Sequence, residues 1–108
     1  MKLIRAIIRP EKVAGVLAEL SDAGFPAVTK AEVVGRGKQR GIKVGDISYD
    51  EIPKNLLMFV CEDEYKDHVL EVIKRKAKTG EKGAFGDGKI FVSEVEDVYT
   101  ISSGERKL

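Results

Sequence analysis

The sequence has no tryptophan, one cysteine, one histidine and few aromatic residues. A single cysteine, Cys61, excludes an intrachain disulfide and a cysteine-based metal cluster. Because it lies in an apolar run (56–61), we interpret it as a buried structural thiol. His68 has no visible partner and is interpreted as a surface histidine. The scarcity of aromatic rings disfavours single-stranded nucleic acid as a partner, since such binding depends on stacking.

The chain also lacks a charge imbalance and a long apolar segment. Its 19 basic and 18 acidic residues give a formal net charge of +1, so no basic field attracts nucleic acid. No segment approaches the roughly 20 apolar residues of a membrane span. The first residues do not have the apolar stretch of a signal peptide. We therefore expect a cytoplasmic protein without membrane insertion, folded as a single domain over residues 1–108.

The apolar periodicity predicts four main strands and two helices. Strands are expected at about 3–9, 27–34, 56–61 and 89–95. Helical spacing predicts one helix that starts with Pro10 and stops at Gly24, and a second helix over 65–77. This order is the βαββαβ arrangement of a ferredoxin-like α+β fold, an antiparallel sheet with two helices on one face. We expect a short final strand at 98–101 and a flexible polar tail at about 102–108.

Two glycine-rich segments contain most of the distinctive composition. The first opens a long loop between the second and third strands, about 37–52, and such structureless connections are usually functional. The second, about 79–89, ends in Gly86-Asp87-Gly88-Lys89. Glycine lets backbone N–H groups approach a phosphate, and a nearby lysine neutralises its charge. The alternative interpretation of Gly-Asp-Gly is a tight turn before a strand.

Residues that could act as catalysts are scarce. Neither glycine-rich segment matches a Walker sequence, and Gly35-Arg36-Gly37 lacks the third glycine of a dinucleotide fingerprint. The histidine and the cysteine have no positioned partner. Most carboxylates fall on helix faces or at helix ends, where they are solvated. An enzyme is therefore disfavoured.

Several motifs occur in a fixed order along the chain. They are Ile7-Ile8-Arg9-Pro10, then Gly35-Arg36-Gly37-Lys38-Gln39-Arg40-Gly41, Pro53-Lys54, Thr79-Gly80 and Gly86-Asp87-Gly88-Lys89-Ile90-Phe91-Val92. In this order and spacing they resemble the P-II family of nitrogen-regulatory signal proteins over nearly the whole chain. The resemblance implies a homotrimer that binds ATP or ADP in clefts between subunits. It further implies that 2-oxoglutarate joins Mg-ATP there, and that the long loop engages target proteins.

The resemblance also implies roles for individual residues. The residues expected to wrap the phosphates are Gly86, Asp87, Gly88 and Lys89. Those expected around the adenine, ribose or phosphates are Ile7, Thr29, Gly35, Lys38 and Val60. Gln39 would ligate Mg²⁺ together with ATP and 2-oxoglutarate. Lys54 would pair with the distal carboxylate of 2-oxoglutarate, near the backbone amides of Arg40 and Gly41. For Gln39 and Lys54 the alternative is a solvated loop edge.

The chain departs from the common family pattern in three places. The long loop is shorter and lacks the tyrosine-containing segment that is modified in some relatives. The connection between Gly80 and Gly86 is longer. Thr100 and Ser102 stand where the family commonly places two arginines against the nucleotide phosphates, and Arg106 is the nearby residue that could compensate.

The text of the long loop resembles one subgroup, the P-II proteins found with nitrogenase genes in archaea and some anaerobic bacteria. They act with a second P-II subunit to inhibit nitrogenase, and 2-oxoglutarate relieves the inhibition. We therefore expect a non-catalytic sensor, a homotrimer or a hetero-oligomer with a second P-II subunit, whose target is nitrogenase. One alternative is a P-II protein that controls an ammonium transporter or glutamine synthetase. Another is a P-II-like trimer that senses a different small ligand, and an enzyme ranks third.

Overall fold

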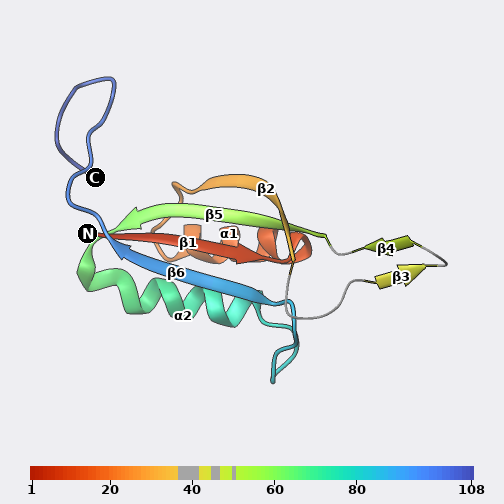
Figure 1. Ribbon diagram of the computed structural model, residues 1–108. Coiled ribbons are helices and arrows are strands. Elements are labelled where there is room, and N and C mark those ends of the chain that lie inside the picture. The colour runs from red at the N-terminus through yellow and green to blue at the C-terminus, as the bar shows by residue number, and fades with distance from the viewer. Residues whose placement is uncertain (37–41, 45–46, 50) are drawn as a thin grey trace.

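The computed structural model describes residues 1–36, 42–44, 47–49 and 51–108 (Figure 1). Lys38, Gln39, Arg40 and Gly41, which the sequence assigns to ligands, lie outside the described residues. The elements run in the order β1 (Lys2–Ile8), the 3-10 turn η1 (Pro10–Lys12), α1 (Val13–Asp22), β2 (Thr29–Gly35), β3 (Ile42–Val44), β4 (Ile47–Tyr49), β5 (Ile52–Cys61), the 3-10 turn η2 (Asp63–Tyr65), α2 (Lys66–Ala77) and β6 (Gly88–Glu94).

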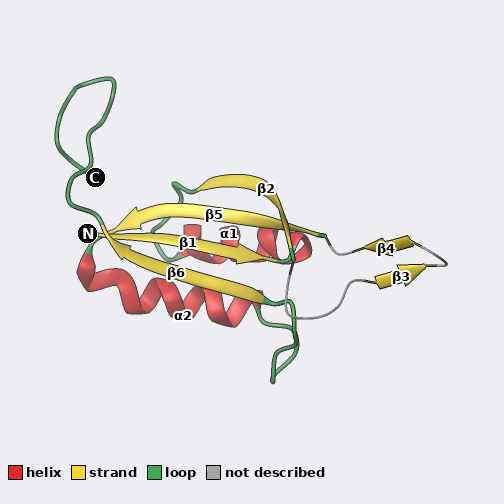
Figure 2. Ribbon diagram, in the orientation of Figure 1, coloured by secondary structure: helices red, strands yellow, loops and turns green. Residues whose placement is uncertain are grey.

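Four of the strands form one antiparallel sheet in the order β2-β5-β1-β6. The two helices pack together and cover one face of it (Figure 2). This arrangement confirms the ferredoxin-like α+β fold. The two central strands are β5 and β1, which explains why their sequences are the most apolar.

The core lies between the sheet and the helices, and strand alternation decides which residues enter it. In β1 the side chains of Ile4, Ala6 and Ile8 are buried, whereas Arg5 between them is exposed. Their neighbours on β5 follow the same period of two. The other buried apolar residues are Val13, Val16, Leu20, Leu57, Phe59, Cys61, Val69, Val72, Ile73 and Ala77. Cys61 is thus a buried structural thiol, and burial raises its pKa, while His68 is exposed, as expected.

Backbone chemistry explains the ends of the first helical segment. Pro10 opens the turn η1, where a missing N–H costs nothing, and α1 itself begins three residues later than the sequence predicted. At the other end Gly24 has a φ of +98°, and the Phe25 N–H donates to the Leu20 carbonyl at 2.7 Å. A left-handed glycine with this hydrogen bond is a Schellman cap, so the predicted stop at Gly24 is confirmed.

Two of the predicted elements are wrong. The connection after β2 is not structureless, because β3 and β4 pair with each other within it, Lys43 opposite Ser48. The strand that follows it is also longer than predicted, since β5 starts at Ile52 and not at residue 56. Within β5, pairing with β1 begins only at Asn55, so Pro53 pairs with β2 alone. A proline is tolerated there because it has no N–H to donate to a second neighbouring strand.

The predicted strand at 98–101 is replaced by a single bridge between Tyr99 and Arg106. We call residues 95–108 the C-terminal arm. The arm leaves the sheet at the end of β6 that lies near the N-terminus (Figure 1). Short local hydrogen bonds close it, among them Thr100 N–H to the Glu105 carbonyl at 2.9 Å.

Candidate functional site

The sheet face opposite the helices carries most of the described residues that the sequence assigns to ligands. Ile7 of β1 lies directly opposite Lys89 of β6 in the strand register. Lys54 of β5 lies opposite Val33, and a Cβ placed on Gly35 would contact the Lys54 side chain at 3.7 Å. The end of this open face, together with the 79–87 loop that leads into β6, therefore forms the candidate site.

Asp87 organises the 79–87 loop through both of its carboxylate oxygens. Oδ1 accepts hydrogen bonds from the Thr79 hydroxyl at 2.6 Å and from Nε of Arg9 at 3.1 Å. Oδ2 accepts from the N–H groups of Ala84 at 2.8 Å and Thr79 at 3.1 Å. Arg9 also donates through Nη2 to the Phe85 carbonyl at 2.7 Å. One carboxylate thus ties the end of α2, the loop and the end of β1 together.

The charge of Asp87 is strongly stabilised in this position. Burial by itself would raise the pKa of its carboxyl group, because burial penalises the ionised form. The hydrogen bonds from Thr79, Ala84 and Arg9 outweigh burial and hold the pKa well below its usual range. Asp87 is therefore ionised at any physiological pH, and its oxygens are occupied by partners within the chain.

Lys54 contacts the same loop from the sheet side. Its ammonium group donates a hydrogen bond to the Gly86 carbonyl. Burial, and next the neighbouring positive charge of Arg9, lower the pKa of Lys54, while Glu11 and Asp87 oppose the shift. The lysine expected to meet 2-oxoglutarate is thereby in direct contact with the loop expected to meet the nucleotide.

The glycines of the loop are required by its packing on the protein itself. Gly88 has a φ of +109°, and a Cβ there would lie 1.7 Å from the Ile7 carbonyl oxygen. Gly86 has a φ of +90°, and its Cβ would lie 3.2 Å from Nη2 of Arg9. Both positions need glycine for backbone reasons. The glycine pattern is consequently explained without a phosphate, and support for a ligand must come from other groups.

The backbone N–H groups of the 79–87 loop could bind a ligand. Among the described residues, the N–H groups of Phe85 and Gly86 donate to no acceptor. They lie between Ala84 and Asp87, whose N–H groups are both used within the loop. A loop with consecutive unused N–H groups and a nearby lysine can receive an anion.

Comparison with known proteins gives a consistent result. Residues 1–105 match the family model described as "Nitrogen regulatory protein P-II". The chain belongs to the P-II family. It is 52% identical over 108 residues to the "Nitrogen fixation nifHD2 region GlnB-like protein 1" of Methanosarcina barkeri, which covers 100% of both chains. It is also 52% identical, with the same coverage, to the "Nitrogen fixation nifHD region GlnB-like protein 1" of Methanothermobacter marburgensis. A protein of that latter name in Methanothermococcus thermolithotrophicus is 50% identical over 97% of each chain.

Membership of P-II makes this chain a nitrogen-regulatory signal protein, and it confirms the family resemblance of the sequence motifs. The names of the relatives agree with the subgroup that the long-loop text indicated. Two P-II residues that shape the loop were given no role by sequence reasoning. Arg9 and Thr79 both belong to the family motifs, but only their shared contact with Asp87 reveals what they do.

Within the described part of this chain, the expected ligand-binding residues fall into two groups. Ile7, Gly35, Lys54 and the segment 86–89 lie at one end of the open face. Val60 lies six positions after Lys54 on β5, about 20 Å along the strand. Thr29 lies opposite Met58, also toward that far end. One copy of the chain therefore does not bring the two groups together.

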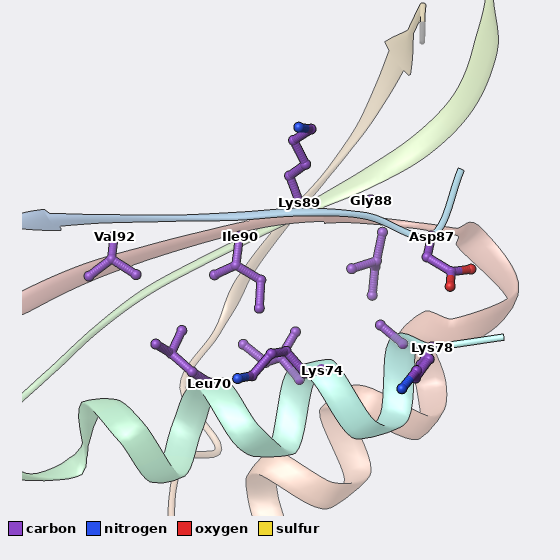
Figure 3. Close-up of a pocket in the computed structure, with 11 residues that line it drawn as sticks. Leu70, Lys74, Lys78, Asp87, Gly88, Lys89, Ile90 and Val92 are labelled. Atoms are coloured by element: carbon purple, nitrogen blue, oxygen red, sulfur yellow. The ribbon is translucent and has the colours of Figure 1, made fainter. Parts of the chain in front are cut away.

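A groove of about 540 Å³ lies on the other side of the P-II sheet, between α2 and β6 (Figure 3). Ile90 and Val92 point into it toward Leu70, whereas Lys89 points away from it. The residues that line it are Ile8, Leu70, Ile73, Lys74, Ala77, Lys78, Asp87, Gly88, Lys89, Ile90 and Val92. Ile7, Gly35, Lys54 and Val60 are not among them, so the groove shares Asp87, Gly88 and Lys89 with the candidate site but opens on the opposite face of the sheet.

Three further findings concern the described residues outside the candidate site. Arg106 is paired with Asp97 inside the C-terminal arm. Residues 1–36 and 51–108 contain no group of three His, Cys, Asp or Glu side chains that could hold a metal ion. Within the described residues no helix is long and apolar enough to cross a membrane.

Proposed function

We propose that this P-II chain is a cytoplasmic, non-catalytic sensor that binds ATP or ADP together with 2-oxoglutarate. The observation that carries the proposal is the contact of Lys54 with the Gly86 carbonyl. It makes the expected carboxylate site and the expected phosphate site neighbours. Two ligands that occupy adjoining positions and share one cation can change each other's affinity.

The phosphates would approach the N–H groups of Phe85 and Gly86, with Lys89 near the start of β6. Lys54 would leave the Gly86 carbonyl and pair with the distal carboxylate of 2-oxoglutarate. Because the Asp87 oxygens are occupied by Thr79, Arg9 and Ala84, we assign Asp87 no ligand contact. Mg²⁺ would then be held by Gln39 and by oxygens of the two ligands.

We further propose that the active form is a trimer of this chain or a hetero-oligomer with a second P-II subunit. The open sheet face carries exposed apolar side chains around Arg5, since Met58 and Phe91, which flank Arg5 in the strand register, are 36% and 47% exposed. Exposed apolar surface of this kind marks an association site. Association would also supply what one subunit lacks, because Val60 and Thr29 of one copy could complete the site of another. Light scattering coupled to gel filtration tests this, and a monomeric mass would contradict it.

The proposed target is nitrogenase, reached through the long loop. Support comes from the names of the relatives, which place them in nitrogen-fixation gene regions. Pull-down from an extract of nitrogen-fixing cells distinguishes the candidates. Recovery of nitrogenase components that is weakened by 2-oxoglutarate is the expected result. Recovery of an ammonium transporter or glutamine synthetase without nitrogenase would contradict the proposed target and favour the recovered protein instead.

Calorimetric titration of Mg-ATP, with and without 2-oxoglutarate, tests the ligands. We expect each ligand to tighten the binding of the other, since linkage is reciprocal. ATP binding that is indifferent to 2-oxoglutarate would remove the role of Lys54. Absence of ATP and ADP binding, with tight binding of another metabolite, would favour a P-II-like trimer with a different ligand. The replacement of the two family arginines by Thr100 and Ser102 makes that outcome a specific alternative.

A further inference from the structure

We propose that Arg9 and Thr79 are positioning residues that act through Asp87 and hold the 79–87 loop in the shape that receives the nucleotide. The nucleotide part of this inference rests on the proposed function. Neither side chain needs to touch the ligand. Their task is to hold the Asp87 carboxylate, and through it the backbone donors of the loop.

The first argument is that Asp87 connects segments far apart in the chain. Arg9 is 78 positions from Asp87 in the sequence and Thr79 is eight positions away, yet both donate to the same oxygen, Oδ1. The Arg9 and Asp87 side chains are partly shielded, with exposures of 27% and 20%. Hydrogen bonds to a shielded charge are stronger than exposed ones.

The second argument is that Arg9 itself is fixed. It follows β1, a central strand of the sheet, and its carbonyl accepts the Lys12 N–H at 3.0 Å in the turn η1. Its guanidinium then reaches both Asp87 and the Phe85 carbonyl. The loop is thus held against the end of a central strand by two donor groups of one side chain.

The third argument concerns which backbone donors remain. The Asp87 carboxylate takes the Ala84 N–H, and the Ala84 carbonyl takes the Asp87 N–H at 3.2 Å. These reciprocal bonds close a turn whose two central residues, Phe85 and Gly86, keep their N–H groups unused among the described residues. Preorganised donors of this kind bind an anion without first paying the cost of ordering the loop.

Thr79 gives the sharpest test, because valine and serine separate its hydroxyl group from its shape. We would titrate Mg-ATP into the wild-type protein and into Thr79→Val, Thr79→Ser and Arg9→Met. We expect Thr79→Val and Arg9→Met to weaken ATP binding about tenfold, the size of one lost charge-assisted hydrogen bond. Thr79→Ser should bind as the wild type does. The matched control is Arg75→Met, which removes an arginine–carboxylate pair of 2.8 Å with Glu19 on the helices and should leave ATP binding unchanged.

Amide hydrogen exchange of the nucleotide-free protein gives the second measurement. Exchange at Ala84 and Asp87 should be faster in Thr79→Val and Arg9→Met, and unchanged at Ile4 in the core. Wild-type affinity together with wild-type exchange in Thr79→Val would overturn the inference. Faster exchange with unchanged affinity would overturn its nucleotide part. If the wild-type protein binds no nucleotide, the proposed function fails, and exchange at Ala84 alone then decides whether Arg9 and Thr79 position the loop.

Discussion

The 79–87 loop and the C-terminal arm are two glycine-containing surface segments that are held in opposite ways. The loop depends on side chains from distant elements, Arg9 from the end of β1 and Lys54 from β5. The arm is closed by partners within itself, such as the Asp97–Arg106 ion pair. Phe85 of the loop is 77% exposed and Ile101 of the arm is 99% exposed, so exposure does not distinguish the two segments.

The difference shows that the stability of a surface segment follows from where its partners are fixed. Contacts with a central strand couple a segment to the cooperative core, whereas local contacts open with little consequence elsewhere. The loop should therefore be part of the cooperative fold, and the arm should behave as a separate local unit. Each prediction below tests that contrast.

The largest effect is expected from alanine at glycines of positive φ. In Gly88→Ala the Cβ would meet the Ile7 carbonyl oxygen at 1.7 Å, so strands must shift, at a cost of about 3 kcal/mol or more. In Gly104→Ala, where φ is +72° and no atom lies within 4 Å, only the backbone conformation is strained, at about 1–2 kcal/mol. Urea unfolding measures both. Equal losses would contradict the contrast between the arm and the start of β6, into which the loop leads.

Removal of one carboxylate charge in each segment should give a smaller difference. Asp87→Asn keeps the shape but turns an amide N–H₂ toward donors, so we expect a loss of about 2 kcal/mol of unfolding free energy. Asp97→Asn removes a partly exposed ion pair, in which the Arg106 side chain is 65% exposed, and should change stability by less than about 1 kcal/mol. The same urea titrations report both values. A loss in Asp97→Asn as large as that in Asp87→Asn would show that the arm belongs to the cooperative unit.

The pH dependence of the loop follows from the lowered pKa of Asp87. A carboxyl group whose pKa is lower in the folded state stabilises that state above its unfolded pKa of about 3.9, and the contribution is lost as pH falls through the folded pKa. Protection of the Ala84 N–H should therefore persist as the pH falls below about 4. Exchange measured from pH 6 to pH 3 tests this, with Asp87→Asn as the control that lacks the titrating group. Loss of protection near pH 4 would mean that the Asp87 hydrogen bonds do not hold the loop.

The smallest expected effect is a shift in the pKa of Lys54. Burial and the charge of Arg9 lower its pKa, so Arg9→Met should raise that pKa, although it stays below the usual value because burial remains. NMR titration of carbon-13-labelled lysine measures the shift. Arg106→Met in the arm is the control and should leave Lys54 unchanged. A Lys54 pKa that does not respond to Arg9→Met would place the two cations too far apart to interact.

Local patterns were enough to predict the main elements of the fold. The short, isoleucine-rich segment 3–9 predicts a strand, and Gly24 predicts a helix end, because each depends on residues close in sequence. The hairpin of β3 and β4 was missed because each strand has only three residues, too few to show a period. The strand expected at 98–101 is absent because Tyr99 pairs within the arm and not with the sheet.

The candidate site was predictable only in part. The family motifs located Lys54 and the segment 86–89, and the structure places them in contact. The motifs also contain Arg9 and Thr79 but give no reason to connect them with Asp87. The predictions for Lys38, Gln39, Arg40 and Gly41 remain predictions, because these residues lie outside the described part of the chain.

The sequence by itself determined the family and the order of the four main strands and the two helices. It could do so because hydrophobic periods and motif spacing are local properties of a chain. Only the tertiary structure decided that one carboxylate, Asp87, gathers Arg9, Thr79 and Ala84 and that Lys54 contacts Gly86. Those contacts join residues up to 78 positions apart, and they arise only when the ordering of β1, β5 and β6 in one sheet brings the ends of these strands together.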